Sequence, residues 1–352
     1  TTYGGAYGFN SETGPGPQPP RLSSVEKMIP EEDRWPIGDM WEYHCGRNEF
    51  DNMDRYIKAL NTRYGKPEDL ETFLYRSQIA SYEAVRPMFE AFCANQHRAT
   101  GVIQWMLNSA WPETYWQLYD WFLNPTGAFY GTKTGSRPLN IVYDYDTGEA
   151  VVCNTTLSSH PKLRADITLY DINSKEVFRA SVDAAVGENR SRSITEITLP
   201  DDREFAVYFL DMRLIDEEEQ EVCRSFYWLS AKQDGMAYEK SSWYITPMNS
   251  YADFTDLNDL PLVEPEVTVS RNGESGLFVT LENNSKSIAF GLELIVVDKK
   301  SGEPLLPVYW DDNYISLLPG ETRTLSCEAG GSTDAGVRLG GWNVEERMIA
   351  IQ

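Results

Sequence analysis

Between residues 52 and 92 the apolar positions recur mostly every three or four residues, which is the spacing of one helix face. The spacing predicts a helix over 52–64 and a longer one over 67–92. Pro67 suits the first turn of the longer helix, and Pro87 would kink or divide that helix further along. One face of the longer helix should pack against a large partner, and its apolar members are Leu70, Phe73, Leu74, Tyr82, Val85, Phe89 and Phe92.

The next apolar stretch, residues 101–108, is nearly continuous, as expected for a strand buried on both faces of a parallel sheet. A second helix is expected over 115–123, and Asn124-Pro125 would end it. A strand, a polar loop and a helix in succession form a βα unit, and α/β barrels build their active sites at the carboxyl ends of such strands. Trp105 and Asn108 are therefore candidates to line a pocket, although Trp105 could equally be ordinary core.

After Arg137-Pro138 the period changes to two and stays there, with examples in residues 165–170 and 210–214. Short alternating strands separated by turns are typical of an antiparallel sandwich. The same pattern resumes beyond a linker-like stretch at 253–265, which predicts two sandwiches in tandem. We expect three domains: residues 1–136 as an α/β unit, 137–252 as one sandwich and 253–352 as another.

The charge balance argues against nucleic acid and anionic lipid as partners. The chain has 31 basic and 54 acidic residues, a net charge of −23. Such a surface would repel nucleic acid and anionic lipid, and no apolar run of membrane-spanning length occurs. The five scattered cysteines lack metal-site spacing, so no metal is expected. The 10 Trp, 20 Tyr and 14 Phe residues favour a carbohydrate-binding protein, although large cores also absorb aromatic residues.

Three tripeptides, beginning at Asn154, Asn189 and Asn283, fit the N-glycosylation signal. All three lie in strand-and-turn regions, as expected of a chain that faces a secretory lumen. Three such tripeptides can also arise by chance. The expectation for location is therefore an extracellular or a secretory or lytic compartment.

Glu12 is the most conspicuous single candidate. It sits among small residues and is followed by a loop rich in glycine and proline, which favours sharp bends and a close approach of a ligand. The plain alternative is an acidic residue in a solvated loop.

Several motifs together resemble glycoside hydrolase family 2, and most of all its exo-β-D-glucosaminidases. The motifs that carry the resemblance are GAYGFNSET at 5–13, RYGKP at 63–67, QIASYE at 78–83, GVIQWMLNSAWP at 101–112, LYD at 118–120 and GAFYG at 127–131. The resemblance implies that residues 1–136 are the last two strands and helices of a (β/α)₈ TIM barrel, followed by two immunoglobulin-like β-sandwich domains.

The resemblance also assigns roles. It implies that Glu12 is the nucleophile of a retaining mechanism and that Trp105, Asn108, Trp111 and, more weakly, Tyr7 line the sugar site. The acid/base carboxylate of the family precedes the nucleophile, and no residue before Glu12 matches its motif. A complete barrel takes about 250 residues. We therefore expect the chain to be the C-terminal portion of a larger enzyme, either nicked or truncated, whose N-terminal portion carries the acid/base.

The predicted activity is release of non-reducing terminal β-D-glucosamine from chitosan oligosaccharides, without a cofactor. Two alternatives stay open. One is β-mannosidase or endo-β-mannosidase specificity, since those enzymes share the architecture. The other is that the isolated chain is a non-catalytic accessory or carbohydrate-binding fragment.

Overall fold

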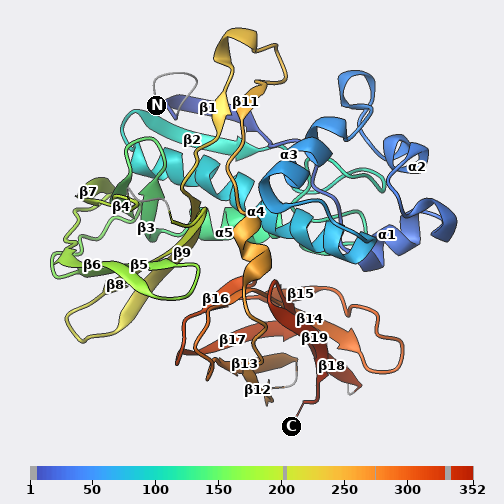
Figure 1. The fold of residues 1–352 in the computed structure, drawn as a ribbon. Helices are drawn as coiled ribbons and strands as arrows, with labels where there is room; N and C mark the ends of the chain where they lie inside the picture. The colour runs from blue at the N-terminus through green and yellow to red at the C-terminus, as the bar shows by residue number, and fades with distance from the viewer. Residues whose placement is uncertain (1–5, 201–203, 274, 330–333, 352) are drawn as a thin grey trace.

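The computed structural model has three units of structure, and the first contains a long helix that lies at the centre of the molecule (Figure 1). The structure describes residues 6–200, 204–273, 275–329 and 334–351. The first unit carries five helices: α1 Leu22–Met28, α2 Asp39–Tyr43, α3 Asp54–Tyr64, α4 Leu70–Ala94 and α5 Gly127–Gly135. Its two strands, β1 (Gly8–Thr13) and β2 (Ala99–Gln104), pair in parallel.

The two long helices were predicted well. Predicted helix 52–64 is α3, and predicted helix 67–92 is α4, a 25-residue helix that begins after Asp69. The Asp69 carboxylate accepts a hydrogen bond from the Thr72 N–H (2.7 Å), which supplies a partner to an otherwise unsatisfied donor of the first turn. Pro87 lies inside α4 and does not divide the helix.

The predicted helix over 115–123 is wrong. Residues 115–123 form turns and isolated bridges, and Trp116 and Leu123 have positive φ angles of 46° and 67°, which a right-handed helix excludes. The Asp120 carboxylate accepts hydrogen bonds from the N–H groups of Phe122 (2.9 Å) and Asn124 (3.0 Å). Side-chain bonds of this kind offer the backbone an alternative to the helical ladder.

The prediction of a strand buried on both faces is also wrong. β2 ends at Gln104 rather than Asn108, and β1 is the strand with which it pairs in the described part of the chain. Helix α4 contacts β2, yet Ile103 of this strand is 51% exposed. Within the described residues the two parallel strands do not close into a barrel.

Two antiparallel sandwiches follow, as the alternating pattern predicted. In the first, sheet β3-β4-β7 faces sheet β6-β5-β8-β9; in the second, sheet β12-β13-β17-β15 faces sheet β16-β14-β18-β19. The first sandwich has strands β3 Leu139–Asp144, β4 Glu149–Asn154, β5 Arg164–Asp171, β6 Glu176–Asp183, β7 Arg190–Glu196, β8 Val207–Ile215 and β9 Glu221–Ser230. The second has β12 Glu266–Asn272, β13 Gly276–Glu282, β14 Ala289–Asp298, β15 Val308–Trp310, β16 Ile315–Leu317, β17 Thr322–Ala329, β18 Ala335–Gly341 and β19 Val344–Ile349.

A short hairpin, β10 (Gly235–Met236) with β11 (Met248–Ser250), separates the two sandwiches. The linker-like stretch after it is ordered and carries a 3₁₀ turn over Thr255–Asp259. Leu257 is fully buried, and the Phe254 N–H donates to the Arg63 carbonyl at the end of α3 (2.7 Å). The stretch therefore ties the second sandwich to the helical unit.

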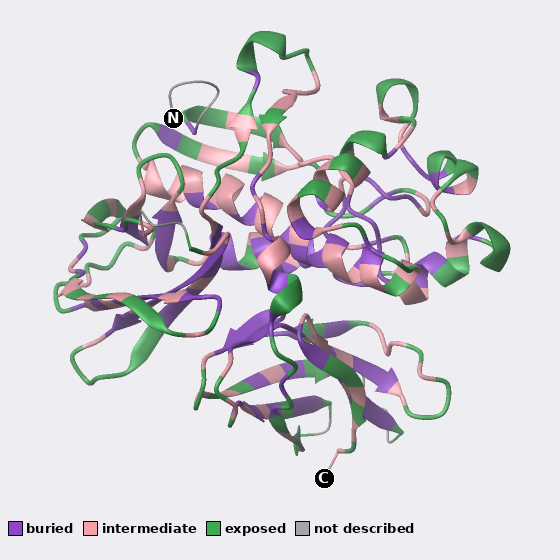
Figure 2. Cartoon of the chain, in the orientation of Figure 1, coloured by how far each residue is buried: buried purple, intermediate pink, exposed green. Residues whose placement is uncertain are grey.

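Burial is concentrated on α4 and on the facing sides of the sandwich sheets (Figure 2). One continuous apolar cluster joins the helical unit to the second sandwich and includes Phe73 of α4 and Phe290 of β14. Helix α5 lies unusually close to α4, because glycines at 127, 131 and 135 form its contact face. A Cβ atom on Gly131 would lie 2.4 Å from the Tyr82 carbonyl oxygen.

Both sandwiches contain the same hydrogen-bonded turn, and it uses two of the three glycosylation tripeptides. The Asn154 Nδ2 donates to the carbonyls of Ser158 (2.7 Å) and Gly187 (2.8 Å), and the Asn283 Nδ2 donates to those of Ser287 (2.8 Å) and Leu317 (3.1 Å). Both asparagines are fully buried, so these two tripeptides do not present their asparagine to solvent. Asn189 is exposed.

Candidate active site

The parallel pair β1–β2 brings Glu12 and Trp105 to the same end of the strands. Thr13 pairs with Gln104, and the Trp105 N–H donates to the Thr13 carbonyl (2.7 Å). Both residues thus lie at the carboxyl ends of adjacent parallel strands, which is where open and closed α/β sheets place their ligands.

The Glu12 carboxylate faces solvent. Glu12 is exposed, and its backbone N–H donates to the Asn10 side-chain oxygen (3.2 Å). The next residue, Thr13, turns inward, with its hydroxyl 3.8 Å from the sulfur of Met88 on α4. The strand end is therefore held on the α4 side, while the carboxylate is presented on the opposite side.

Gly14 explains why the loop after Glu12 is rich in glycine. A Cβ atom at this position would lie 2.5 Å from the Trp105 carbonyl oxygen and 3.1 Å from Cδ1 of Trp116. A side chain there would push the Glu12 loop away from the end of β2. The peptide bond between Trp105 and Met106 is cis, and the Met106 N–H donates to the Trp116 carbonyl (2.8 Å).

The other three predicted site residues lie in different surroundings. Trp111 is half-buried and stacks on His44, with ring centroids 5.4 Å apart, while Tyr43 meets its edge. Asn108 is exposed and lines a cavity of about 280 Å³ whose far wall is Tyr309 of the second sandwich. Tyr7 precedes β1 and is 70% exposed. Of the five predicted residues, Glu12 and Trp105 are the two that the β1–β2 pairing brings to the same strand ends.

Sequence reasoning missed a cluster of aromatic residues beside Gly14. Trp116 contacts Phe50 edge to face, with centroids 4.7 Å apart, and Phe50 contacts Trp243 and Tyr244 of the β10–β11 hairpin. The large aromatic content was the available signal, but it does not identify positions. Trp116 was assigned to a helix that does not form, and the hairpin lies over a hundred residues away in sequence.

The carboxyl group of Glu113 is buried at the end of the loop that carries Trp111. Burial raises its pKa, and interactions with Ser109 and Trp111 partly oppose this shift.

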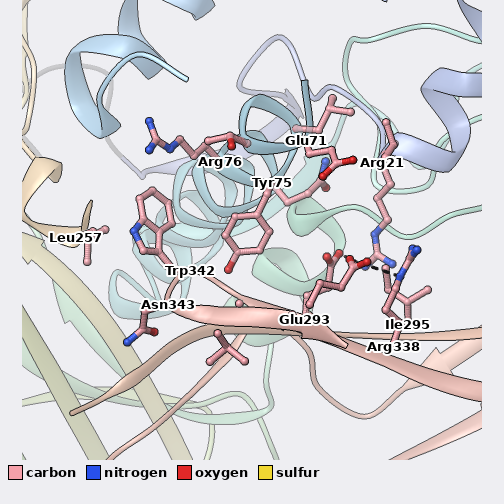
Figure 3. A pocket seen from close by; sticks show the side chains of 18 of the residues that line it. Arg21, Glu71, Tyr75, Arg76, Leu257, Glu293, Ile295, Arg338, Trp342 and Asn343 are labelled. Atoms are coloured by element: carbon pink, nitrogen blue, oxygen red, sulfur yellow. Dashed lines mark ion pairs between the residues drawn. The ribbon is translucent and has the colours of Figure 1, made fainter. Parts of the chain in front are cut away.

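A large cleft lies elsewhere (Figure 3). It has a volume of about 680 Å³ and separates α1 and the start of α4 from the second sandwich. Its charged groups bind one another: Arg21 pairs with Glu293 (3.1 Å) and donates to the hydroxyl of Tyr314 (3.1 Å), which in turn donates to Glu293 (2.6 Å). None of the predicted site residues lines this cleft, and we interpret it as a seam between two units.

No three His, Cys, Asp or Glu side chains of the described residues are grouped as ion ligands. Among the described helices, none combines the length and apolar character that crossing a bilayer requires.

Sequence profiles of two domains match the sandwiches. Residues 147–234 match a mannosidase Ig/CBM-like domain, and residues 243–344 match the Ig-fold domain of exo-β-D-glucosaminidases. An exo-β-D-glucosaminidase of Arthroderma benhamiae is 34% identical over 357 residues, which cover 98% of this chain and 40% of that protein. The enzyme of the same name from Hypocrea jecorina is 33% identical, with 99% of this chain and 41% of that protein covered.

Solved structures give the same relation. The complex of Amycolatopsis orientalis exo-chitosanase CsxA with PNP-β-D-glucosamine superposes with a TM-score of 0.90 and 32% identity, covering 98% of this chain and 43% of that one. A β-D-mannosidase from Dictyoglomus thermophilum shares the fold, with a TM-score of 0.73 at 19% identity over 96% of this chain and 38% of that one. The chain therefore spans about 40% of the length of its curated relatives. It is a homologue of the exo-β-D-glucosaminidases of glycoside hydrolase family 2, and it carries their immunoglobulin-like domains.

Proposed function

We propose that this chain is the C-terminal portion of a retaining glycosidase that releases non-reducing terminal β-D-glucosamine from chitosan oligosaccharides. The observation that carries the proposal is the position of Glu12, an exposed carboxylate at the carboxyl end of β1, in a chain similar over 98% of its length to exo-β-D-glucosaminidases. The relative CsxA was solved with a glucosamine derivative bound. In the proposed assignment Trp105, Asn108, Trp111 and Tyr7 line the sugar site.

The proposed reaction has two steps. The Glu12 carboxylate attacks the anomeric carbon, and the bond to the leaving oxygen breaks as that oxygen takes a proton from a second carboxylic acid. Water then hydrolyses the glycosyl ester on Glu12, with the second carboxylate as general base, so that the configuration is retained. Gly14 contributes by allowing the loop after Glu12 to lie against Trp105.

The second carboxyl is proposed to come from a polypeptide portion that also completes a TIM barrel on β1 and β2. Supporting this idea, the strand pair and the residues next to it in sequence expose several large apolar side chains. Their exposed fractions are 70% for Tyr7, 63% for Phe9, 51% for Ile103, 47% for Trp105 and 61% for Leu107. An open pair of parallel strands with such side chains is an association surface.

The role of Glu12 is tested in the full-length enzyme with an aryl β-D-glucosaminide. Glu12→Gln should lower kcat by several orders of magnitude and leave substrate binding largely intact, since the amide keeps the shape but not the nucleophile. Glu12→Ala with added azide should yield the α-glucosaminyl azide, because azide then attacks the anomeric carbon from the vacated face. Glu32→Gln, an exposed carboxylate of another loop, is the matched control. An unchanged kcat in Glu12→Gln would refute the assignment.

A second specificity is favoured by one observation, the match of residues 147–234 to a mannosidase domain. Initial rates on aryl β-D-glucosaminide and aryl β-D-mannoside, measured at equal concentration, separate the two. Faster hydrolysis of the mannoside would replace the glucosaminidase proposal. A third possibility, a non-catalytic carbohydrate-binding fragment, applies to the isolated chain, which on our proposal binds sugar without turnover.

We also propose an extracellular or lytic location, where chitosan oligosaccharides would be encountered. Asn189 supports this proposal because its side chain is exposed, whereas Asn154 and Asn283 are buried. Peptide mapping of the secreted protein should find a glycan at Asn189. Retention of all the protein in the cytosol would contradict the proposal.

A further inference from the structure

The hairpin between the two sandwiches presents a tryptophan at its tip. Figure 1 shows the hairpin projecting from the body of the molecule, and Figure 2 shows its tip as one of the exposed parts of the molecule. Trp243 is 77% exposed, which leaves more of its indole open to solvent than in any other described tryptophan. A single exposed aromatic residue is ordinary on protein surfaces. The surroundings of Trp243 are what set it apart.

The hairpin loop is braced by its own hydrogen bonds. The Ala237 N–H donates to the Pro247 carbonyl (2.8 Å), and the Ser242 N–H donates to the Ile245 carbonyl (2.9 Å). The hydroxyls of Ser241 and Thr246 are hydrogen-bonded across the loop (2.9 Å). Because the loop is closed in this way, a ligand that contacts Trp243 would lose less free energy to ordering the loop.

Side-chain contacts also fix the tip to the helical unit. Tyr244 accepts a hydrogen bond from Arg55 of α3 (3.3 Å), whose guanidinium lies 5.7 Å from the ring centroid. Phe50 meets the rings of Tyr244 and Trp243 nearly at right angles, at 5.2 and 6.1 Å. Trp243 therefore makes its contact with Phe50 edge to face, and much of the indole surface stays open.

The same rings connect Trp243 to the candidate active site. Phe50 contacts Trp116 (4.7 Å), and Trp116 lies against Gly14, two residues after Glu12. Trp243 is thus separated from the Glu12 loop by two intervening aromatic rings. A ligand that reaches from Glu12 to Trp243 has to extend past the unit at which Glu12 reacts.

The net charge of the whole chain, −23, favours a cationic ligand. Glu49 and Asp51 are exposed on either side of Phe50 in sequence. The basic residues nearby are Arg47, which is also exposed, and Arg55, which donates to the Tyr244 hydroxyl, while Glu239 and Lys240 of the hairpin offset one another. An aminosugar polymer combines ammonium groups, which carboxylates and aromatic faces attract, with apolar sugar faces that stack on indole.

We propose that Trp243 stacks on a glucosamine unit of the leaving-group portion of a chitooligosaccharide, beyond the unit that Glu12 attacks. This inference rests on the proposed function. The hairpin would then determine how strongly the length of the oligosaccharide affects its affinity, while the sugar unit that reacts is bound at Glu12.

The test compares substrates of increasing length in the full-length enzyme. For Trp243→Ala we expect KM to rise about 2-fold to 10-fold on oligosaccharides long enough to reach the hairpin, with kcat unchanged and a smaller effect on an aryl β-D-glucosaminide. Trp243→Tyr should recover most of the affinity, because tyrosine keeps an aromatic face. Trp121→Ala is the matched control, since Trp121 is 46% exposed and is not a member of the cluster.

The outcomes separate the two proposals. A parent enzyme that hydrolyses neither substrate refutes the proposed function. A parent that hydrolyses both, with Trp243→Ala equal to it at every length, overturns the inference about the hairpin alone. Equal losses on the short and the long substrates would show a structural role for Trp243 and would overturn the inference as well.

Discussion

The close contact between α4 and α5 predicts that Gly131→Ala destabilises the protein. Gly131 of α5 faces the Tyr82 carbonyl oxygen of α4, and a Cβ atom added there would lie 2.4 Å from that oxygen. An ordinary contact begins near 3.4 Å. The helices must therefore separate by about 1 Å, or α5 must rotate, before alanine fits. The opposing atom is backbone in the middle of a 25-residue helix, so it cannot move aside alone.

Two free-energy terms set the expected magnitude for Gly131→Ala. Overpacking of this kind costs about 1–3 kcal/mol, and the absence of a movable side chain places Gly131 at the upper end. Alanine regains about 1 kcal/mol through its better helix propensity. The net loss should be about 2 kcal/mol, or a Tm lower by about 2–4 °C.

Thermal unfolding followed by far-ultraviolet circular dichroism measures the effect. Gly135→Ala should cost less, because its Cβ would lie 2.8 Å from the Arg86 carbonyl oxygen. Gly187→Ala is the control, since the added Cβ would meet its nearest neighbour at an ordinary 3.4 Å. A Tm for Gly131→Ala equal to or above that of the parent would refute the reasoning, because it would show that the two helices separate at no cost.

Three further predictions concern buried charge and exposed apolar surface. Burial raises the pKa of Asp120 in the folded protein above its value in the unfolded chain. The protonated carboxyl group therefore contributes fully to the free energy of unfolding below the unfolded pKa, and this contribution is lost as pH rises through the folded pKa. Asp120→Asn should flatten the dependence of Tm on pH in that window; an unchanged slope would contradict this. Arg86 and Glu90 form a buried ion pair (2.6 Å). Arg86→Met should lower the free energy of unfolding, measured by denaturant titration, by about 3–5 kcal/mol, because it leaves the Glu90 charge unpaired. Adding Glu90→Leu to this variant should recover most of the lost free energy. If the double variant is as unstable as the single one, packing and not charge is responsible. Finally, Ile103→Thr should weaken self-association of the isolated chain in sedimentation without lowering Tm, and a parent chain that sediments as a stable monomer would contradict the proposed docking surface.

The sequence predicted the elements whose local signals agree. Helix α4 has periodic apolar residues and was expected from that pattern, although it begins at Leu70, so that Pro67 lies before its first turn. Strands were expected where apolar and polar residues alternate, as in β5. The division into domains at residues 136 and 252 stays a prediction. Where the local signals were ambiguous, tertiary contacts decided the structure. The aromatic run at 115–123 looked helical, but Trp116 adopts a positive φ and packs on Phe50.

The candidate site stays a prediction. Glu12 was singled out because it sits among small residues before a loop rich in glycine and proline, and the pairing of Thr13 with Gln104 places Glu12 and Trp105 at the same end of the strand pair. The Trp243 hairpin was not predictable, because its closeness to Gly14 depends on how the sandwiches pack on the helices. No local pattern encodes a contact between residues 50 and 243.

In the turn that both sandwiches share, folding and N-glycosylation compete for the side-chain nitrogen of the asparagine. Oligosaccharide transfer needs a free Asn side-chain nitrogen, while closing each sandwich needs the Asn154 or Asn283 Nδ2 to donate two hydrogen bonds. In a compartment that glycosylates chains as they emerge, whichever process comes first excludes the other. A glycan on Asn154 or Asn283 would therefore mark molecules that failed to fold, whereas one on Asn189 is compatible with the native state. The order of events during synthesis would decide the yield of folded protein.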